Sequence, residues 1–420
     1  MIAPLAVSDA IADLLATPDA AAVPRHTTAE HRQQLAYGPL GIALLHIERA
    51  ASGRGPWQRV HDWMAAATAQ PLTTGPDSHP FYGAPALAHA VACAAEHLPG
   101  PYQRALDKLD TQMTADVTRR IDAAHRRLDA QLLPTLAEFD CIRGLAGHGS
   151  HLLRRDPGSP AMRAVLEYCV RLTEPLTDQR ENLPGWWTAG SPSGRPHPDF
   201  PLGHGNLGVA HGIGGVLAVL ALAARKGALV AGHHDALRTI LAWLDHWQDP
   251  SGQGTVWPYW VTRAELRTDR LAPSSPRRPS WCYGTAGLAR AQQLAALVLG
   301  DTSRQSTAEE TLACALHDPA QIEATTDHGL CHGFAGLAHV AARTAHDAHP
   351  QTAERLRTVL PVLLTGVCRP DAVPAEAARA LLQDEEAGPG FLNGASGAAL
   401  GLMSAATAPH SAWDACLLTS

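Results

Sequence analysis

Cysteine and histidine residues precede two similar glycine turns in the second half of the chain. Cys331 and His332 are adjacent and precede Gly333, which opens a Gly-x-x-Gly turn leading into an apolar stretch. Cys282 comes two residues before Gly284, which opens a second turn of the same plan. Two thiolates and an imidazole suit Zn²⁺. We therefore expect one zinc ion held by Cys282, Cys331 and His332, with an open coordination position as in catalytic zinc sites.

The alternative interpretation of these residues is structural. A single cysteine in a reducing compartment is usually a small buried hydrophobic residue. Two matched cysteines with a histidine beside one of them favour the metal instead. Core positions are predicted for the other cysteines, which are Cys93, Cys141, Cys169, Cys314, Cys368 and Cys416.

Two further titratable residues precede turns of the same type. His211 comes directly before Gly212, and Asp140 lies four residues before Gly144. A histidine in this place is either a general acid or a hydrogen-bonded core residue. An aspartate there is either a functional group or a cap or dipole partner of the helix that follows. The residues themselves leave both alternatives open.

Seven turns of this kind punctuate the chain, and each leads into small and apolar residues. A helix lined with glycine and alanine on several sides packs closely against neighbours all round. We therefore predict seven inner helices, the second of them after a degenerate turn. The turns occupy residues 38–41, 83–86, 144–147, 212–215, 284–287, 333–336 and 394–397.

Amphipathic stretches with charged faces alternate with the apolar ones and predict outer helices. The turns recur at uneven intervals of 45 to 72 residues, whereas an open array of repeats has a fixed period. We predict an all-α fold, an α/α toroid of seven inner and seven outer helices, as a single domain over residues 1–420. The clearest outer stretches are residues 106–128, 161–173, 234–246, 307–316 and 352–364.

Two long connections, residues 182–206 and 248–280, are rich in proline and tryptophan. Both run into turns that carry candidate residues, and long ordered loops on a compact domain are usually functional. We expect both loops to lie over the active-site end of the toroid, with a short strand within residues 255–262.

Composition and charge narrow the function classes. The hydrophobic content of 45% is enough for a large core, and the aromatic content of only 5% leaves alanine and leucine to build it as helices. A net charge of −7 without a basic run gives no electrostatic case for nucleic-acid binding. Residues 207–224 carry no formal charge, but a histidine and four glycines there favour a buried helix over a membrane span. The start of the chain lacks a charged secretory signal, so we expect a cytoplasmic protein without a transmembrane segment.

Three motifs together resemble the lanthionine synthetase C-like family, the lanthipeptide cyclases. Asn-x-Gly-x-Ala-His-Gly occupies residues 206–212, Ser-Trp-Cys-Tyr-Gly occupies residues 280–284, and Leu-Cys-His-Gly occupies residues 330–333. The resemblance extends over nearly the whole chain, because all seven turns fall in order. It implies an α/α toroid, in agreement with the repeats.

The resemblance also implies roles for individual residues. His211 matches the acid/base histidine of the family, and Asp140 matches the aspartate beside it. Tyr283 and Arg278 match further active-site positions. The zinc ligands of the family are matched by Cys282, Cys331 and His332.

The implied reaction adds a cysteine thiol of a precursor peptide to dehydroalanine or dehydrobutyrine, which closes a lanthionine or methyllanthionine ring. Zinc would deprotonate the thiol, and His211 would protonate Cα with Asp140 orienting it. Expected partners are the dehydrated precursor peptide and, at the membrane periphery, a dehydratase and an exporter. With no kinase-like or lyase-like segment, the chain resembles a stand-alone cyclase.

Three other functions stay open at this point. One is another zinc-dependent thiol alkylation on a toroid, such as prenyl transfer. The second is a toroid that binds a peptide or glutathione around a structural zinc. The third, a carbohydrate-active toroid, needs a pair of carboxylates, and only Asp140 is a candidate.

Overall fold

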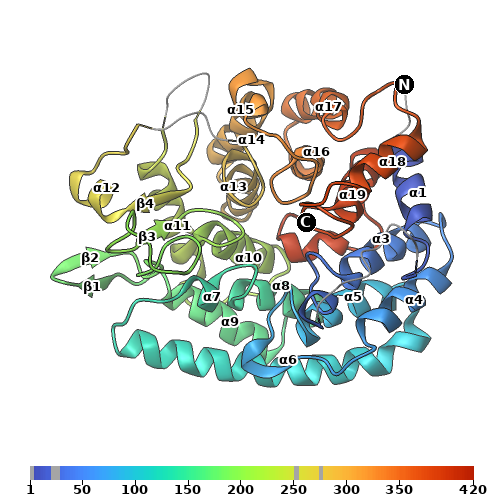
Figure 1. Cartoon of the computed structure of the whole chain (residues 1–420). Coiled ribbons are helices and arrows are strands. Elements are labelled where there is room, and N and C mark those ends of the chain that lie inside the picture. Colours follow the sequence, from blue (N-terminus) through green and yellow to red (C-terminus); the bar gives the residue numbers. More distant parts are fainter. Residues whose placement is uncertain (1–3, 20–28, 250–254, 274–277) are drawn as a thin grey trace. The chain divides into compact units, whose positions relative to one another are not determined.

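The computed structural model describes residues 4–19, 29–249, 255–273 and 278–420 (Figure 1). Its contacts divide the chain into two compact units, each assembled from two segments. The first unit comprises Met1–Met113 and Thr325–Asp414, and the second comprises Thr114–Ala324 and Ala415–Ser420. The chain passes between the units within helix α6 (Pro99–Asp129), after Ala324, and within the short 3₁₀-helix η2 (Trp413–Leu417). The prediction of one domain over the whole chain stays a prediction.

The named secondary-structure elements described in the first unit are all helices, joined by loops and turns. Helices α3, α5, α16 and α19 begin at the predicted turns, and α3 packs against α4, α5 and α19, while α16 packs against α17 and α19. Helices α1 and α18 cover α19. The elements are α1 (Pro4–Leu14), α2 (Ala29–Arg32), α3 (Pro39–Ala51), α4 (Trp57–Ala67), η1 (Gly75–Asp77), α5 (Ala84–Ala95), α16 (Phe334–Asp347), α17 (Pro350–Thr365), α18 (Pro374–Leu382) and α19 (Ala395–Ala406).

The second unit repeats this pairing of a buried helix with a covering one. Helix α8 packs against α9, α10 against α8, α11 and α13, and α13 against α14. Its helices are α7 (Leu136–Phe139), α8 (Leu145–Arg155), α9 (Pro160–Arg171), α10 (Ile213–Arg225), α11 (His233–His246), α12 (Arg263–Thr268), α13 (Thr285–Leu299), α14 (Thr302–His317) and α15 (Pro319–Glu323).

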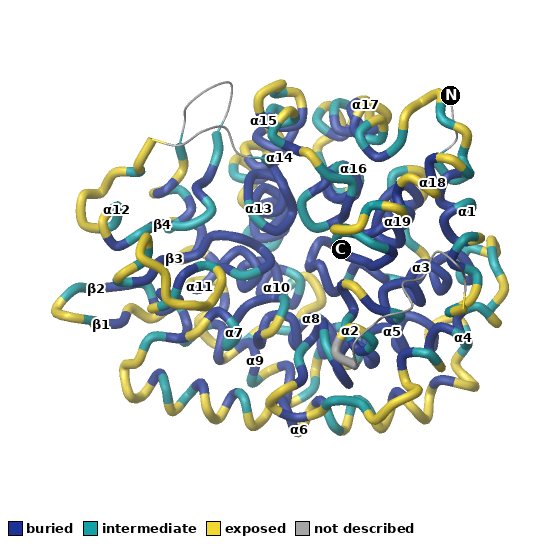
Figure 2. The backbone as a smooth tube through the Cα atoms, in the orientation of Figure 1, coloured by how far each residue is buried: buried dark blue, intermediate teal, exposed yellow. Residues whose placement is uncertain are grey.

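The predicted inner and outer helices are both present. In α3 every residue from Leu40 to Ala50 is buried, and Figure 2 shows α10 and α13 buried along most of their length. In α11 burial recurs at helical spacing, at Ala236, Leu237, Ile240, Leu241 and Leu244. The degenerate turn also works as predicted, because α5 begins directly after Gly83. A positive φ of 72° makes glycine the favoured residue there.

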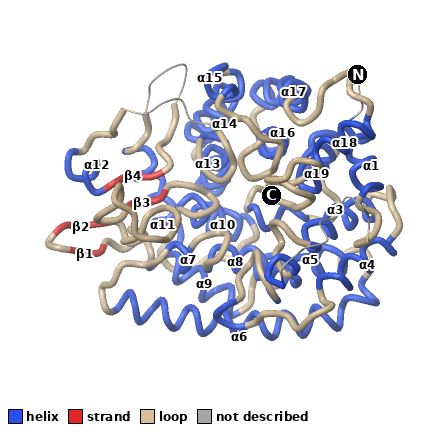
Figure 3. The backbone as a smooth tube through the Cα atoms, viewed as in Figure 1, coloured by secondary structure: helices blue, strands red, loops and turns tan. Residues whose placement is uncertain are grey.

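Four short strands are described in the second unit (Figure 3). Strands β1 (Leu176–Asp178) and β2 (Glu181–Leu183) form one antiparallel pair. Strand β3 (His204–Asn206) pairs with β4 (Trp260–Thr262), which confirms the short strand expected near residues 255–262. Strands β3 and β4 lie within the two predicted loops, whereas β1 precedes the first loop and β2 overlaps its start. Residues 250–254 and 274–277 of the second loop lie outside the described residues.

The uncharged stretch 207–224 forms a buried core helix from Ile213 onward, as predicted, while its first six residues form the turn before α10. Among the described residues, no helix is both long and apolar enough to cross a membrane.

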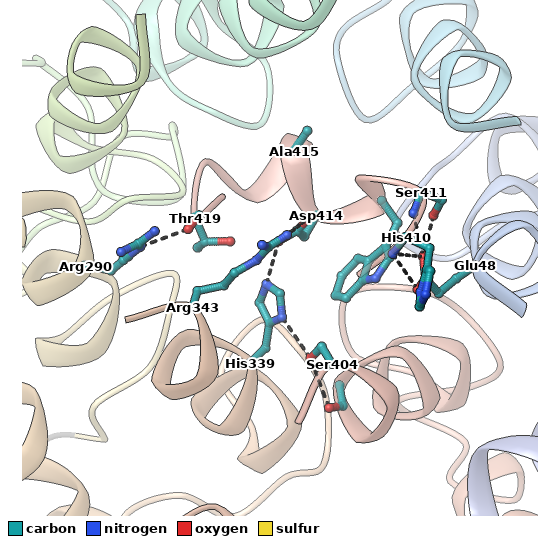
Figure 4. Close-up of polar contacts among 12 residues, drawn as sticks. Glu48, Arg290, His339, Arg343, Ser404, His410, Ser411, Asp414, Ala415 and Thr419 are labelled. Atoms are coloured by element: carbon teal, nitrogen blue, oxygen red, sulfur yellow. Dashed lines mark hydrogen bonds and ion pairs between the residues drawn. The ribbon is translucent and has the colours of Figure 1, made fainter. Parts of the chain in front are cut away.

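Residues 410–414 are held in the first unit by buried charges (Figure 4). The Glu48 carboxylate accepts hydrogen bonds from the backbone N–H and the hydroxyl of Ser411, at 2.9 and 2.7 Å. The fully buried Asp414 carboxylate accepts two hydrogen bonds from Arg343, at 2.6 and 2.8 Å, and pairs with His339 at 3.2 Å. Burial alone would raise the pKa of Asp414, but the hydrogen bond from His339 and the charge of Arg343 hold it well below its usual range.

Candidate active site

Main-chain hydrogen bonds join three turns of the second unit that lie far apart in the sequence. The carbonyl oxygen of Cys282 accepts from the N–H groups of Val209 and Ala210, at 3.0 and 3.3 Å. The carbonyl oxygen of Ala210 accepts in turn from the N–H of Cys141, at 3.1 Å. The turns before α8, α10 and α13 therefore meet, and they bring the predicted acid/base pair close to one predicted zinc ligand.

His211 and Asp140 form a hydrogen-bonded pair. The His211 Nδ1 lies 2.7 Å from Asp140 Oδ2. Because a carboxylate only accepts, the imidazole donates through Nδ1 and keeps Nε2 for other chemistry. The Asp140 side chain is 1% exposed, whereas that of His211 is 34% exposed. The histidine is therefore the member of the pair that a substrate can reach.

Asp140 also caps the turn that leads into α8. Its Oδ1 accepts from the backbone N–H groups of Arg143 and Gly144, at 2.6 and 2.9 Å. One carboxylate thus makes both sets of contacts, since Oδ1 holds the turn before α8 and Oδ2 holds His211. The cap fixes the direction in which Oδ2 points.

Tyr283 flanks the exposed histidine. Its ring centroid lies 6.3 Å from that of His211, and its hydroxyl accepts a hydrogen bond from Asn206 Nδ2 at 3.2 Å. The Asn206 Oδ1 accepts from the N–H of Gly208 at 3.0 Å. A Cβ at Gly208 would lie 2.7 Å from the Tyr283 ring, so the ring needs glycine at this position.

Burial keeps a second histidine of this neighbourhood neutral. Desolvation lowers the pKa of His204 to about 4, although a hydrogen bond from its Nδ1 to the carbonyl of Gly190, 2.9 Å long, works in the opposite direction. The neutral Nε2 accepts from Asn206 Nδ2 at 3.3 Å. His204 therefore supports Asn206, which in turn supports Tyr283.

The second long loop borders this site within its unit. The rings of Tyr259 and Trp260 lie 5.5 and 6.1 Å from that of Tyr283. The carbonyl oxygen of Arg278 accepts from the Tyr259 hydroxyl at 3.2 Å. Gly284 has a φ of 114°, and a Cβ there would lie 2.6 Å from that same carbonyl. The backbone of Arg278 is thus held against the turn, while a role for its guanidinium stays a prediction.

Cys331 and His332 lie in the first unit, where an aspartate unnoticed in the sequence binds the histidine. The His332 Nδ1 donates to Asp327 Oδ2 at 2.6 Å, and Asp327 Oδ1 accepts from the N–H of Gly329 at 3.3 Å. The N–H of Cys331 donates to the carbonyl of Leu392 at 2.8 Å. A histidine bound through Nδ1 to a carboxylate presents Nε2 to a metal, the usual arrangement around ligating histidines.

The sequence did contain a signal for Asp327. It stands six residues before Gly333, as Asn206 stands six residues before Gly212. In both turns the side-chain oxygen would be struck by a Cβ on that glycine, at 2.3 and 2.5 Å. The two turns therefore share one construction, with an Asp or Asn at the start and a histidine directly before the glycine.

Comparisons with known proteins place the chain in a family and show its fold. The family model described as lanthionine synthetase C-like protein matches residues 30–418. The chain belongs to the lanthionine synthetase C-like family. The nisin biosynthesis protein NisC of Lactococcus lactis subsp. lactis is 24% identical over 245 residues, which are 57% of this chain and 56% of that protein. The aligned region thus spans little more than half the length of this relative.

A solved structure of nisin cyclase has the same fold. It matches with a TM-score of 0.78 at 21% identity, over 97% of this chain and 96% of that one. This likeness confirms the predicted fold class, all-α of the α/α-toroid type.

The zinc ligands of this lanthionine synthetase C-like chain stay a prediction. Cys282 belongs to the second unit, whereas Cys331 and His332 belong to the first. Over the described ranges, no group of three or more His, Cys, Asp or Glu side chains is placed to hold a metal ion. The donor types nevertheless suit zinc, and His332 is oriented as a ligand would be.

The remaining cysteines behave largely as the sequence suggested. The buried ones are Cys93, Cys141, Cys169 and Cys416, and the half-buried ones are Cys314 and Cys368. Burial raises the pKa of Cys169 to about 12, so its thiol stays protonated and unreactive.

Proposed function

We propose that the chain is a zinc-dependent lanthipeptide cyclase, which adds cysteine thiols of a precursor peptide to dehydroalanine or dehydrobutyrine. The products are lanthionine and methyllanthionine thioether rings. Family membership supports the reaction class. The observation that carries the proposal is the 2.7 Å contact between a half-exposed histidine, His211, and a buried carboxylate, Asp140.

In the proposed reaction His211 is the general acid. Attack of the thiolate sulfur on Cβ forms the C–S bond and moves the π electrons of the C=C bond toward Cα and its carbonyl. Protonated His211 gives the Nε2 proton to Cα, which completes the addition. Asp140 holds Nδ1–H and stabilises the imidazolium before the transfer. Tyr283, placed beside the ring by Asn206, limits the orientations that the imidazole can take.

We propose that Cys282, Cys331 and His332 hold a single Zn²⁺ ion. When bound, zinc deprotonates a coordinated thiol at neutral pH and holds the thiolate ready for attack. Asp327 keeps the Nε2 of His332 available by accepting the proton on Nδ1. The Ser280 hydroxyl donates to the carbonyl of Tyr283, which holds the turn that carries Cys282.

The proposed substrate determines the proposed partners. Dehydroalanine and dehydrobutyrine arise by loss of water from serine and threonine, so a dehydratase must supply the peptide. We propose that the chain acts in the cytoplasm and meets this dehydratase and an exporter at the membrane periphery.

The decisive assay incubates the zinc-loaded protein with a dehydrated peptide that contains cysteine. Ring closure does not change the mass, so remaining thiols are counted by alkylation and mass spectrometry. We expect the thiols to disappear with wild-type protein. Prenyl diphosphate with an intact thiol peptide forms the second arm, and prenyl transfer there in place of ring closure would refute the proposal.

Two variants separate the proposed roles. Cys282→Ala should lose both zinc and ring formation, whereas His211→Ala should keep zinc and lose most turnover. Cys169→Ala is the control for loss of a buried thiol. His246→Ala is the control for loss of a histidine–aspartate pair in the same unit, since His246 lies 2.6 Å from Asp269. Stoichiometric zinc in Cys282→Ala, or wild-type rates in His211→Ala, would remove the respective assignment.

A further inference from the structure

Residues 415–420 lie against two of the three turns that build the candidate active site in the second unit. The Cys141 Sγ–H donates to the carbonyl of Cys416 at 3.2 Å. The indole Nε1–H of Trp281 donates to the carbonyl of Leu417 at 2.9 Å. Cys141 directly follows Asp140, and Trp281 directly precedes Cys282. Two consecutive carbonyls of one segment therefore hold the neighbours of two candidate site residues.

The segment is itself anchored on both sides of these two contacts. The Ser150 hydroxyl of α8 donates to the carbonyl of Ala415 at 2.7 Å. The Arg290 Nε–H of α13 donates to the carbonyl of Thr419 at 2.9 Å, as Figure 4 shows. The side chains from Cys416 to Thr419 are all buried. A segment fixed at four carbonyls by side chains from α8, α13 and the turns before them has little freedom to shift.

The same turns determine the distance between Asp140 and His211, on which the proposed acid catalysis depends. The Asp140–His211 contact spans the turns before α8 and α10, and the carbonyl of Cys282 links the latter to the turn before α13. Displacing the turn at Trp281 moves the carbonyl of Cys282, and with it the N–H groups that place His211. A misplacement of about 1 Å can lower a rate on the order of 100-fold.

We propose that Cys416 and Leu417 are positioning residues, whose carbonyls set the geometry of His211 and Asp140 by holding Cys141 and Trp281. This inference rests on the proposed function for its kinetic consequence. Its structural consequence, the placement of the imidazole, is independent of that function. The two can therefore be tested separately.

The test variant is Trp281→Phe, which keeps a buried aromatic ring but removes the donor to Leu417. Its matched control is Trp63→Phe in the first unit, because the Trp63 indole also donates to a buried carbonyl, that of Leu15, at 2.9 Å. Both variants lose one buried hydrogen bond, so similar falls in Tm are expected. In the cyclisation assay, kcat of Trp281→Phe should fall at least about tenfold with KM within about twofold, whereas the control should keep both.

A second readout does not need turnover. In protein labelled with ¹⁵N-histidine, the Nδ1 proton bound to Asp140 gives a resonance that is assigned by its loss in His211→Gln. We expect this resonance to shift or broaden in Trp281→Phe and to stay unchanged in Trp63→Phe. Cys141→Ala provides a second variant should Trp281→Phe not fold, and the same shift is expected there.

The outcomes distinguish the two proposals. An unshifted resonance in folded Trp281→Phe or Cys141→Ala overturns the positioning role, whatever the activity. A shifted resonance in the variants, together with a wild-type protein that shows no cyclase activity, supports the positioning role and refutes the proposed function. A shifted resonance with an unchanged kcat refutes the kinetic consequence.

Discussion

Replacing Asp140 by asparagine removes the charge behind His211 while it preserves the turn. The Asp140 carboxylate accepts three hydrogen bonds. Two come from backbone N–H groups, at 2.6 and 2.9 Å, and one comes from His211, at 2.7 Å. The amide oxygen of asparagine can keep the two backbone donors. Its NH₂ group then faces the Nδ1 of His211 and cannot accept from it. The variant therefore loses only the bond to the imidazole.

The magnitude follows from the kind of bond that is lost. A hydrogen bond to a charged partner contributes about 1.5–3 kcal/mol. If this bond stabilises the protonated imidazole that gives its proton to Cα, kcat should fall about 10- to 150-fold. Stability should change little, because the capping bonds to Arg143 and Gly144 survive. Asp140→Ala should instead lower both kcat and Tm, since both capping bonds disappear with the carboxylate.

The assay is the thiol-counting cyclisation under saturating peptide, together with thermal unfolding of each variant. Asp269→Asn is the matched control, because Asp269 pairs with His246 at 2.6 Å elsewhere in the second unit. Asp269→Asn should keep wild-type kcat. The reasoning fails if Asp140→Asn cyclises at the wild-type rate, or if its loss of activity is matched by an equal loss of folded protein.

Three further predictions concern metal binding, pH and backbone strain. Asp327→Asn should weaken zinc binding about 10- to 100-fold by releasing the tautomer of His332, as measured by chelator competition, and an unchanged affinity would contradict ligation by His332. Burial lowers the pKa of His46 from 6.5 to about 4. Between these pH values His46 is therefore protonated in the unfolded chain but neutral in the folded one. The free energy of unfolding is therefore highest above about pH 6.5 and falls by about 3 kcal/mol toward pH 4 because of this one histidine. On acidification, the Tm of wild type should fall more than the Tm of His46→Gln. A difference in Tm that stays constant with pH would contradict this cause. Gln131 is exposed with a φ of 55°, so Gln131→Gly should stabilise by up to about 1 kcal/mol; an unchanged or lower Tm would show that no strain is relieved.

Local composition was sufficient to predict most of the long helices and the residues at which the buried ones begin. The glycine turns and the alanine- and leucine-rich stretches after them predicted α3, α5, α8, α10, α13, α16 and α19, and the amphipathic stretches between them predicted α6, α9, α11, α14 and α17. The covering helices α1, α4 and α18 were not among the stretches singled out. Such signals are readable because a helix start and a buried face depend on neighbours within a few residues. The motifs at 206–212, 280–284 and 330–333 were equally local, and they carried the family.

The residues alone did not reveal pairings between distant segments, although the family resemblance implied that Asp140 lies beside His211. That Asp140 binds His211 across 71 positions, rather than only capping α8, follows from how α8 and α10 pack. The hold of Leu417 on Trp281 spans 136 positions, and no periodicity records it. Asp327 was within reach in principle, since it repeats the place of Asn206 in a matching turn.

The sequence alone thus specified the helices, the glycine turns and the types of reactive residue that stand at those turns. Tertiary structure supplied the 2.7 Å contact between Asp140 and His211, and it decided which aspartate orients His332 and which carbonyls hold the turns around Cys282. The division has a physical cause. Helix propensity and burial pattern act over a few residues, whereas a hydrogen bond of 2.7 Å between two turns depends on the packing of every helix that holds them.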